Sequence, residues 1–562
     1  MTLAVLRRSK ALRGRLRALR GQLSALRGQL VLAVPLLAGG LAACEGCRSG
    51  GTGGASVPSA GPAAPAGPPT ARLYLVTDMA GALEPCGCTK DQLGGLDHFG
   101  AWVKSEQAHA PAALVASAGP LFFMDDKLEG DRAEQDRIKA QTIARVLKGL
   151  GFAAFAPAAN DFDDGAAGLK GLAAASGAAV IDADGTAVVR DVGGVKVGFV
   201  GYGQTQATGG EAPKGAAQEV VRRGVDAAKK QGAELLVALV SVGRGEAKRI
   251  ADVVPELNAI VVGAAKSNGD SNTTAPQGEQ VGDVLIVQAA NHLQTVAVLD
   301  VYVRDALVPG TVLKVADATG LELARKREEL ARRIDDLHVK IAAWERDPAI
   351  APKDVAARKQ ELASLEAQRD ALDARPPPAR GSFFRYTLKE MRQSLGEDPG
   401  VQADMATFYR SVNDHNRQAF AGRMPPPAAA GQAEYVGIEA CSTCHEPARK
   451  VWNGTPHAHA YATLSTQLKE FNLECVSCHV TGYEQPAGST VTHVDKLKDV
   501  QCEVCHGPGS KHVASPADKT KIIGHPDPGK CLDCHHPPHV EGFDPSEKMH
   551  VILGPGHGLP LK

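Results

Sequence analysis

The sequence has almost no net charge, and cysteine and histidine are scarce in it before residue 431. Lys and Arg number 62 and Asp and Glu number 63 among 562 residues, which gives a formal net charge of −1. A balanced charge offers no electrostatic attraction for nucleic acid, so we predict no nucleic-acid partner. Eight of the twelve Cys and thirteen of the eighteen His lie at or after residue 441. This skew marks a separate C-terminal module, residues 431–562, which we predict to be mostly helical and irregular in structure.

The C-terminal module repeats one motif four times. C-x-x-C-H occurs at 441–445, 475–479, 502–506 and 531–535. Two thiols one helical turn apart can add to the two vinyl groups of one porphyrin, and the next His then lies under the iron. We therefore predict four covalently bound haems c. The attachment residues are Cys441, Cys444, Cys475, Cys478, Cys502, Cys505, Cys531 and Cys534, and the proximal iron ligands are His445, His479, His506 and His535.

Zinc is the alternative, because paired C-x-x-C is also typical of zinc sites. A zinc site has no need of His directly after the second Cys, yet His follows in all four units. A secreted zinc protein would also leave eight thiols open to oxidation. Haem is therefore the better interpretation.

The module resembles the tetrahaem cytochromes c of the nitrifier hydroxylamine-oxidation pathway. The resemblance covers 434–562 and includes, besides the four units, the segments 456–462, 478–483 and 505–512. It implies His457 and His512 as distal ligands, each to a haem other than that of its nearest motif.

Other histidines remain open as ligands. His493 and His557 are further distal candidates, and His539 or His550 can replace either. His459 and His536 are expected to be neighbours of the haems and not ligands. An iron with two His ligands leaves no place for substrate and carries electrons. The resemblance allows one five-coordinate haem, which could bind nitric oxide, nitrite or hydroxylamine.

The first 43 residues have the pattern of an export signal. Residues 1–30 contain eight Arg or Lys and no acid, and an apolar run at 30–43 ends in Leu-Ala-Ala before Cys44. This run is short for a membrane span. It resembles a bacterial lipobox, which implies cleavage before Cys44 and lipid on its thiol. We predict a periplasmic or outer-membrane lipoprotein held to the membrane by this anchor. An uncleaved N-terminal anchor is the alternative.

A tether and an α/β domain follow the signal. Residues 44–70 are mostly Gly, Ala, Pro and Ser, as in flexible linkers. Residues 71–318 alternate apolar runs with helical patterns, which is typical of a layered α/β domain. We predict strands at 72–77, 113–118, 195–201, 234–241, 259–263, 283–288 and 295–303, and helices that include 133–150 and 217–230.

The α/β domain resembles the 5′-nucleotidase family of metallophosphoesterases. The resemblance rests on residues 73–83 and on Gly94-Gly95-Leu96, and it extends loosely over 71–300. It implies two metals held by an Asp-x-His, a Gly-Asp, an Asn-His and later His residues. Of these ligands only Asp78 and Asn160 remain. The other positions are Ala80, Gly119-Pro120, Asp161, Ser241-Val242 and the run 263–266.

Two ligands cannot hold a dinuclear centre, so we predict an inactive phosphoesterase-like domain without metal. An active nucleotidase is the alternative. Near the mouth of the expected centre lie Cys86 and Cys88. A C-x-C pair makes a strained disulfide, which favours redox exchange or metal binding. Two structural thiols are the alternative.

Two helical segments are expected between the α/β domain and the haem module. Apolar residues at alternating four- and three-residue steps predict an antiparallel helical hairpin, or coiled coil, over 319–376. It would act as a spacer or as an arm through which chains form homo-oligomers. Residues 377–430 are predicted as a helical linker.

The sequence thus favours an exported multidomain protein that carries electrons to or from a redox partner protein over an enzyme. The alternative is an oxidoreductase acting on a small nitrogen or sulfur species, at an open haem or at Cys86 and Cys88.

Overall fold

The computed structural model describes residues 67–85, 92–125, 127–128, 130–206, 213, 215–267, 269, 271–346, 348, 350–372, 378, 380–537, 539–540 and 542–559. The predicted signal at 1–43, the lipidation residue Cys44, most of the tether 44–70 and the pair Cys86 and Cys88 lie outside these residues. Within them, no helix is both long and apolar enough to cross a membrane.

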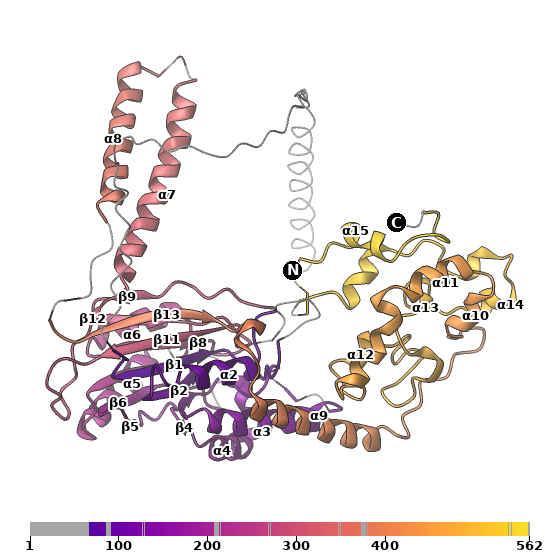
Figure 1. The fold of residues 1–562 in the computed structure, drawn as a ribbon, viewed down its shortest axis with the longest axis horizontal. Helices are drawn as coiled ribbons and strands as arrows, with labels where there is room; N and C mark the ends of the chain where they lie inside the picture. Colours follow the sequence, from indigo (N-terminus) through magenta and orange to yellow (C-terminus); the bar gives the residue numbers. More distant parts are fainter. Residues whose placement is uncertain are drawn as a thin grey trace, which may run out of the picture. The chain divides into compact units, whose positions relative to one another are not determined.

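The first of two β-sheets has seven strands in the order β12-β13-β11-β1-β2-β3-β4. Strands β1 to β4 run parallel, whereas β11 pairs antiparallel with both β1 and β13 (Figure 1). The bounds are β1 Ala71–Thr77, β2 Ala113–Ala118, β3 Phe152–Ala156, β4 Ala179–Val180, β11 Thr295–Tyr302, β12 Ala316–Asp317 and β13 Phe383–Glu390.

The second sheet has six strands in the order β5-β6-β7-β8-β10-β9. Its four central strands are parallel, and β5 and β9 are antiparallel edges. The bounds are β5 Val188–Val192, β6 Val195–Tyr202, β7 Leu235–Ser241, β8 Ala259–Gly263, β9 Glu279–Val281 and β10 Val284–Val287. Side chains of β1, β6 and β7 share one buried core, so the two sheets pack face to face.

Helices cover the outer face of each sheet. The first sheet packs against α2 Leu96–Glu106, α3 Ala133–Gly149, α4 Gly165–Ser176 and α9 Pro399–Ala419. The second packs against α5 Ala216–Lys230 and α6 Arg244–Val253. Short 3-10 turns η1 Ala159–Phe162 and η2 Gln393–Leu395 lie in the connections. Central strands such as β7 are buried along their whole length, because both faces of each sheet are covered.

The prediction of a layered α/β domain is confirmed, with one correction. The predicted strands agree with β1, β2, β6, β7, β8, β10 and β11 to within two residues at each end. Residues 377–430, however, are not a helical linker. They supply β13, which pairs with β11 along its whole length, and α9, whose Met405 and Phe408 enter the core under the first sheet. The α/β domain therefore continues past residue 318 to the end of α9.

The predicted helical hairpin is present as α7 Leu321–Trp344 and α8 Pro352–Asp370. Ile334, Leu337 and Ile341 of α7 pack with Leu365 of α8 in a small core of their own. The hairpin leaves the first sheet after β12 and returns to it at β13, and β12 pairs with β13. It is therefore an insertion within the α/β domain.

The C-terminal module consists of short helices and irregular chain, as predicted. A cluster that includes Tyr461, Val476 and Val480 is its main apolar core, and Phe420, directly after α9, belongs to the same cluster. The bounds are α10 Ile438–Ser442, α11 Glu446–Asn453, η3 Pro456–His459, α12 Ala460–Thr466, η4 Val476–Cys478, η5 Asp495–Leu497, α13 Cys502–His506, α14 Ser510–Ala514, η6 Lys519–Lys521, η7 Pro528–Asp533, α15 Pro545–Lys548 and η8 Met549–Val551.

The core under the first sheet offers a test of the fold. Phe155 of β3 is fully buried, and its ring lies 5.6 Å from that of Phe122 and 5.8 Å from that of Phe152. Phe155→Ala should lower the stability of the α/β domain by about 3–5 kcal/mol, because it leaves a cavity in a packed core. Urea unfolding followed by circular dichroism measures this. Val339→Ala, at a side chain that is 70% exposed, is the control and should change stability by less than about 0.5 kcal/mol.

Candidate functional site

The four C-x-x-C-H units adopt the local geometry that haem attachment requires. Each unit lies in or beside a short helical turn, at α10, η4, α13 and η7. In the first and fourth units the His amide donates to the carbonyl of the first Cys, at 3.0 Å for His445 and 2.9 Å for His535. This turn brings the two thiols and the imidazole to the same side of the chain. None of the eight Cys of the units is in a disulfide.

Three of the four motif histidines face a second histidine. The ring centres of His445 and His512 are 6.4 Å apart, those of His535 and His457 are 6.2 Å apart, and those of His506 and His557 are 6.3 Å apart. Metal–imidazole bonds are about 2 Å long, so two imidazoles on opposite sides of one metal have ring centres roughly 6 Å apart. The three pairs therefore fit an iron between their rings.

These pairs include three of the four distal candidates. His512 and His457 each face a motif outside their own neighbourhood, as the resemblance implies, and His557 faces His506. His493 lies elsewhere, with Nδ1 3.0 Å from Thr492 Oγ1. His536 stacks edge-on with His539 at 5.6 Å.

His479 differs from the other motif histidines. Its Nδ1 donates to the carbonyl of Ala460 at 2.6 Å, as that of His506 does to Ile523, and each bond leaves Nε2 available to a metal. In the described parts of the chain, no second histidine ring pairs with that of His479. His539 is a neighbour, since burial and the charges of His536 and His479 lower its pKa, but its ring forms no such pair with that of His479.

The four C-x-x-C-H units lie in two adjacent pairs. The Cys441 side chain lies beside that of Cys502, and the Cys478 side chain lies beside that of Cys534. The first unit therefore adjoins the third, and the second adjoins the fourth. Cofactors attached to adjoining units would be close neighbours, which favours electron transfer between them.

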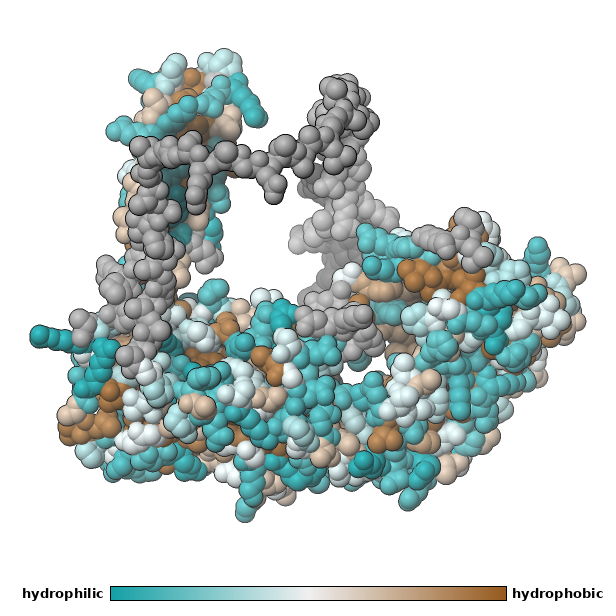
Figure 2. Space-filling view, viewed as in Figure 1, coloured by the Kyte–Doolittle hydropathy of each residue, from teal (hydrophilic) through white to brown (hydrophobic). Residues whose placement is uncertain are grey.

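The surface of the C-terminal module also fits a bound porphyrin. Figure 2 shows hydrophobic residues exposed over the region that Figure 1 assigns to this module. A contiguous exposed apolar patch often marks a surface that a ligand or partner covers. The large apolar side chains exposed in this module are Val513, Ile523, Leu532, Val551 and Leu559.

In the α/β domain, the two remaining phosphoesterase ligands are occupied by backbone. Asp78 follows β1, is buried, and accepts a hydrogen bond from the Ala264 amide at 2.7 Å. Burial raises the pKa of Asp78 to about 7. Asn160 donates to the carbonyls of Met124 and Ser267 and accepts from the Ser267 amide. A backbone amide thus donates to one oxygen of each side chain.

The surrounding turns fill the room that two metals would need. A Cβ on Gly119 would lie 2.0 Å from Asp78 Oδ1, and one on Gly263 would lie 2.2 Å from the Gly119 amide. Asp161, at the expected His position, accepts from three amides, and burial raises its pKa to about 6. In the described residues, no three His, Cys, Asp or Glu side chains gather as a metal site. The residues present do not fit a dinuclear centre.

Cys86 and Cys88 lie outside the described residues, but the residues on either side of them are described. Glu84 Oε2 lies 2.5 Å from Lys469 Nζ, and Gln92 Nε2 donates to the His539 carbonyl at 3.1 Å. Both flanks of this segment therefore contact the C-terminal module.

Part of the C-terminal module is similar in sequence to known cytochromes c. Residues 440–507 match the family described as "Cytochrome c554 and c-prime". The chain is 33% identical over 96 residues to cytochrome c-554 of Nitrosomonas europaea, which covers 14% of this chain and 41% of that protein. The module is that of a multihaem cytochrome c. Its sequence is of the cytochrome c554 type, and the match spans less than half the length of this relative.

Similar solved structures include a nucleotidase and a phosphoesterase. A 5′-nucleotidase precursor from Thermus thermophilus is 17% identical, covers 70% of this chain and 68% of its own, and has a TM-score of 0.38. A calcineurin-like phosphoesterase from Bacillus subtilis is 12% identical, covers 61% of this chain and 97% of its own, and has a TM-score of 0.39.

The buried Asp78 predicts a specific pH dependence. Its pKa is about 7 when folded, against 3.8 for the free group, so the folded chain keeps a proton that the unfolded chain releases. Stability should therefore fall as pH rises from 4 to 7. Asp78→Asn removes this loss and should be more stable than the wild type by about 2–4 kcal/mol at pH 8, and equal to it near pH 4.

Urea unfolding at several pH values measures the effect. The exposed Asp184→Asn is the matched control and should follow the wild-type curve. Parallel curves for Asp78→Asn and the wild type would show that Asp78 is ionised in the folded chain.

Proposed function

We propose that the chain is an exported, lipid-anchored electron carrier with four covalently bound haems c, and that its phosphoesterase-like domain does not hydrolyse phosphoesters. The observation that carries this proposal is the set of three opposed histidine pairs, each with ring centres 6.2–6.4 Å apart. When bound, c-type haem supplies one-electron transfer. Its partner is then a second redox protein, and Cys44 carries the lipid.

In this proposal, different residues of the module attach the haems and ligate their irons. The eight motif cysteines attach them, and the four motif histidines are the proximal ligands. His512, His457 and His557 are the distal ligands of the first, fourth and third units. Imidazole on both sides leaves no position for a substrate on these three irons. The adjoining thiols of Cys441 with Cys502 and of Cys478 with Cys534 support transfer within each pair of units.

A second function is favoured by one observation. Because His479 has no opposing histidine in the described part of the chain, the second unit is the place where an oxidoreductase could bind a small nitrogen or sulfur species. In that case the other three units supply or remove its electrons.

Intact-mass measurement and electron paramagnetic resonance of the mature, oxidised protein test these functions. We expect a mass equal to the chain from Cys44 plus lipid and four haems, and low-spin signals from three of them. Cys475→Ser/Cys478→Ser should lose one haem and keep the three low-spin signals. A haem count below four in the wild type contradicts the proposal.

The haem of the second unit decides between the two functions. A low-spin signal, or a high-spin signal that nitric oxide leaves unchanged, supports electron carriage alone. A high-spin signal that shifts with nitric oxide favours the oxidoreductase.

The proposed lack of phosphoesterase activity has its own test. Purified protein with added manganese, zinc or calcium should not hydrolyse nucleotides or a chromogenic phosphoester above the buffer rate, because backbone occupies the carboxylate of Asp78 and the amide of Asn160. Turnover that Asp78→Ala abolishes would refute this part of the proposal.

A further inference from the structure

The chain that leads into the second C-x-x-C-H unit is bound to the α/β domain. Lys469 pairs with Glu84, which lies between β1 and α2. Leu468 packs against the apolar core under the first sheet. Both contacts come a few residues before Cys475, so the α/β domain sets the path of the segment 469–474.

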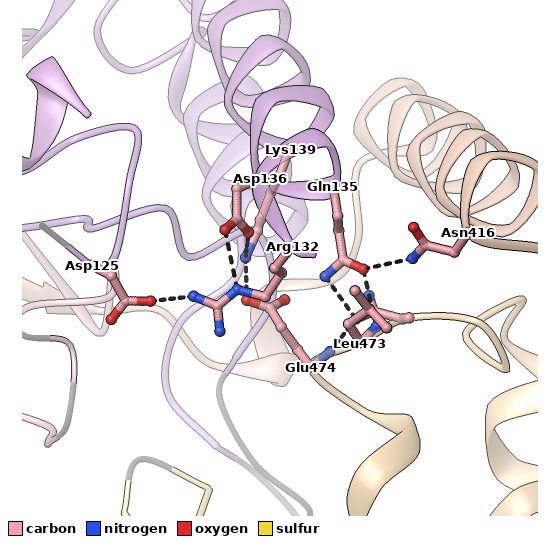
Figure 3. Close-up of polar contacts among 9 residues, drawn as sticks. Asp125, Arg132, Gln135, Asp136, Lys139, Asn416, Leu473 and Glu474 are labelled. Carbon is pink, nitrogen blue, oxygen red and sulfur yellow. Dashed lines mark hydrogen bonds and ion pairs between the residues drawn. The ribbon is translucent and has the colours of Figure 1, made fainter. Parts of the chain in front are cut away.

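Gln135 of α3 is the centre of a hydrogen-bond network with this segment (Figure 3). Its side chain is 0% exposed. Its Nε2 donates to Asn472 Oδ1 at 3.0 Å, and its Oε1 accepts from the Leu473 amide at 3.0 Å and from Asn416 Nδ2 at 3.1 Å. Removing one partner of a buried network leaves the others unsatisfied, so this network fixes the segment in one position.

Lys139, one turn after Gln135 on α3, forms an ion pair with Glu474, the residue that follows Leu473 (Figure 3). Lys139 Nζ lies 2.6 Å from Glu474 Oε1, and Arg132 and Asp136 adjoin the pair. Burial alone would raise the pKa of Glu474, but the Lys139 ammonium outweighs burial and holds that pKa below its usual range. Both partners are therefore charged at neutral pH.

These charges act on the haem-attachment residue itself. Glu474 directly precedes Cys475. Burial raises the pKa of the Cys475 thiol to about 12, and Glu474 and Glu84 raise it further while Lys469 and Lys139 lower it. Two of these four charges, Glu84 and Lys139, belong to the α/β domain. A group attached at Cys475 lies in the same electrostatic field.

We propose that the α/β domain forms part of the environment of the haem at Cys475 and Cys478, with Gln135 as a positioning residue and Lys139 as a residue that sets the reduction potential. The inference rests on the proposed attachment of haem at this unit. A nearby anion stabilises the oxidised, more positive iron, and a nearby cation opposes it. The two partners of the Lys139–Glu474 pair should therefore shift the potential in opposite directions.

Spectroscopic redox titration of the full-length protein tests this inference. The titration is expected to show one reduction step for each haem. The step of the haem at the second unit is the one that is lost in Cys475→Ser/Cys478→Ser. Lys139→Met should shift that step to lower potential and Glu474→Gln to higher potential, with the other three steps unchanged. Lys139→Arg, which keeps the charge, should leave it near the wild-type value.

The matched control is Arg137→Met. Arg137 lies on the same helix and pairs with Asp164 at 2.7 Å, away from the segment 469–474. This variant should leave all four steps in place. Gln135→Leu should broaden the electron paramagnetic resonance signal of the haem at the second unit, because the segment that leads to Cys475 is then no longer held in one position.

The outcomes separate the two proposals. Shifts of the same sign in Lys139→Met and Glu474→Gln would mean that the contact is only structural, and no shift in either would mean that the α/β domain does not reach this haem. Either result overturns the inference while leaving the haem count intact. A wild-type protein without a haem at Cys475 and Cys478 would instead overturn the proposed function. If Lys139→Met fails to fold, Glu474→Gln still gives the sign of the shift, and Lys139→Arg still shows whether the positive charge alone maintains the potential.

Discussion

The separation between opposed imidazole rings is the constraint on which the C-terminal module depends. A metal fixes that separation at roughly 6 Å. The module meets it three times, with histidines contributed by segments far apart in the sequence, such as His457 and His535. Because the apolar core of the module is small, its architecture follows from the positions of these pairs more than from packing. Short helical turns are sufficient for this purpose, since each needs only to present two thiols and one imidazole.

The α/β domain, in contrast, is held together by apolar packing. It has large apolar cores on both sides of its two sheets, and its own backbone binds the two side chains, Asp78 and Asn160, that the sequence resemblance implied as metal ligands. Asp78 keeps its position after β1, but its partner is now the Ala264 amide. Contacts with Lys469, Leu473 and Glu474 join this domain to the C-terminal module.

Much of this organisation could be predicted from local sequence. Apolar runs located seven strands of the two sheets, and the C-x-x-C-H spacing identified the haem units without any structure. β13 was missed because it follows a long inserted hairpin and pairs with β11, some eighty residues earlier in the chain. Nine histidines of the module lie outside the four C-x-x-C-H units, and the sequence alone does not tell which of them are distal ligands. The structure distinguishes them by position, since His557 lies opposite His506 and His493 does not. No sequence pattern marks Gln135 or Lys139, since their partners in the segment 469–474 are more than 330 residues away.

The order of the strands in the first sheet has a consequence for synthesis. β1 pairs with β11, and β11 is covered on its other edge by β13, so the sheet joins residues near 71 to residues near 390. α9, which completes the core below it, ends at Ala419. The α/β domain therefore cannot close its sheet until most of the chain has emerged. Pairings between such distant segments form slowly. The incomplete sheet then leaves β11 with an unpaired edge, which is the stage at which the chain is most exposed to aggregation.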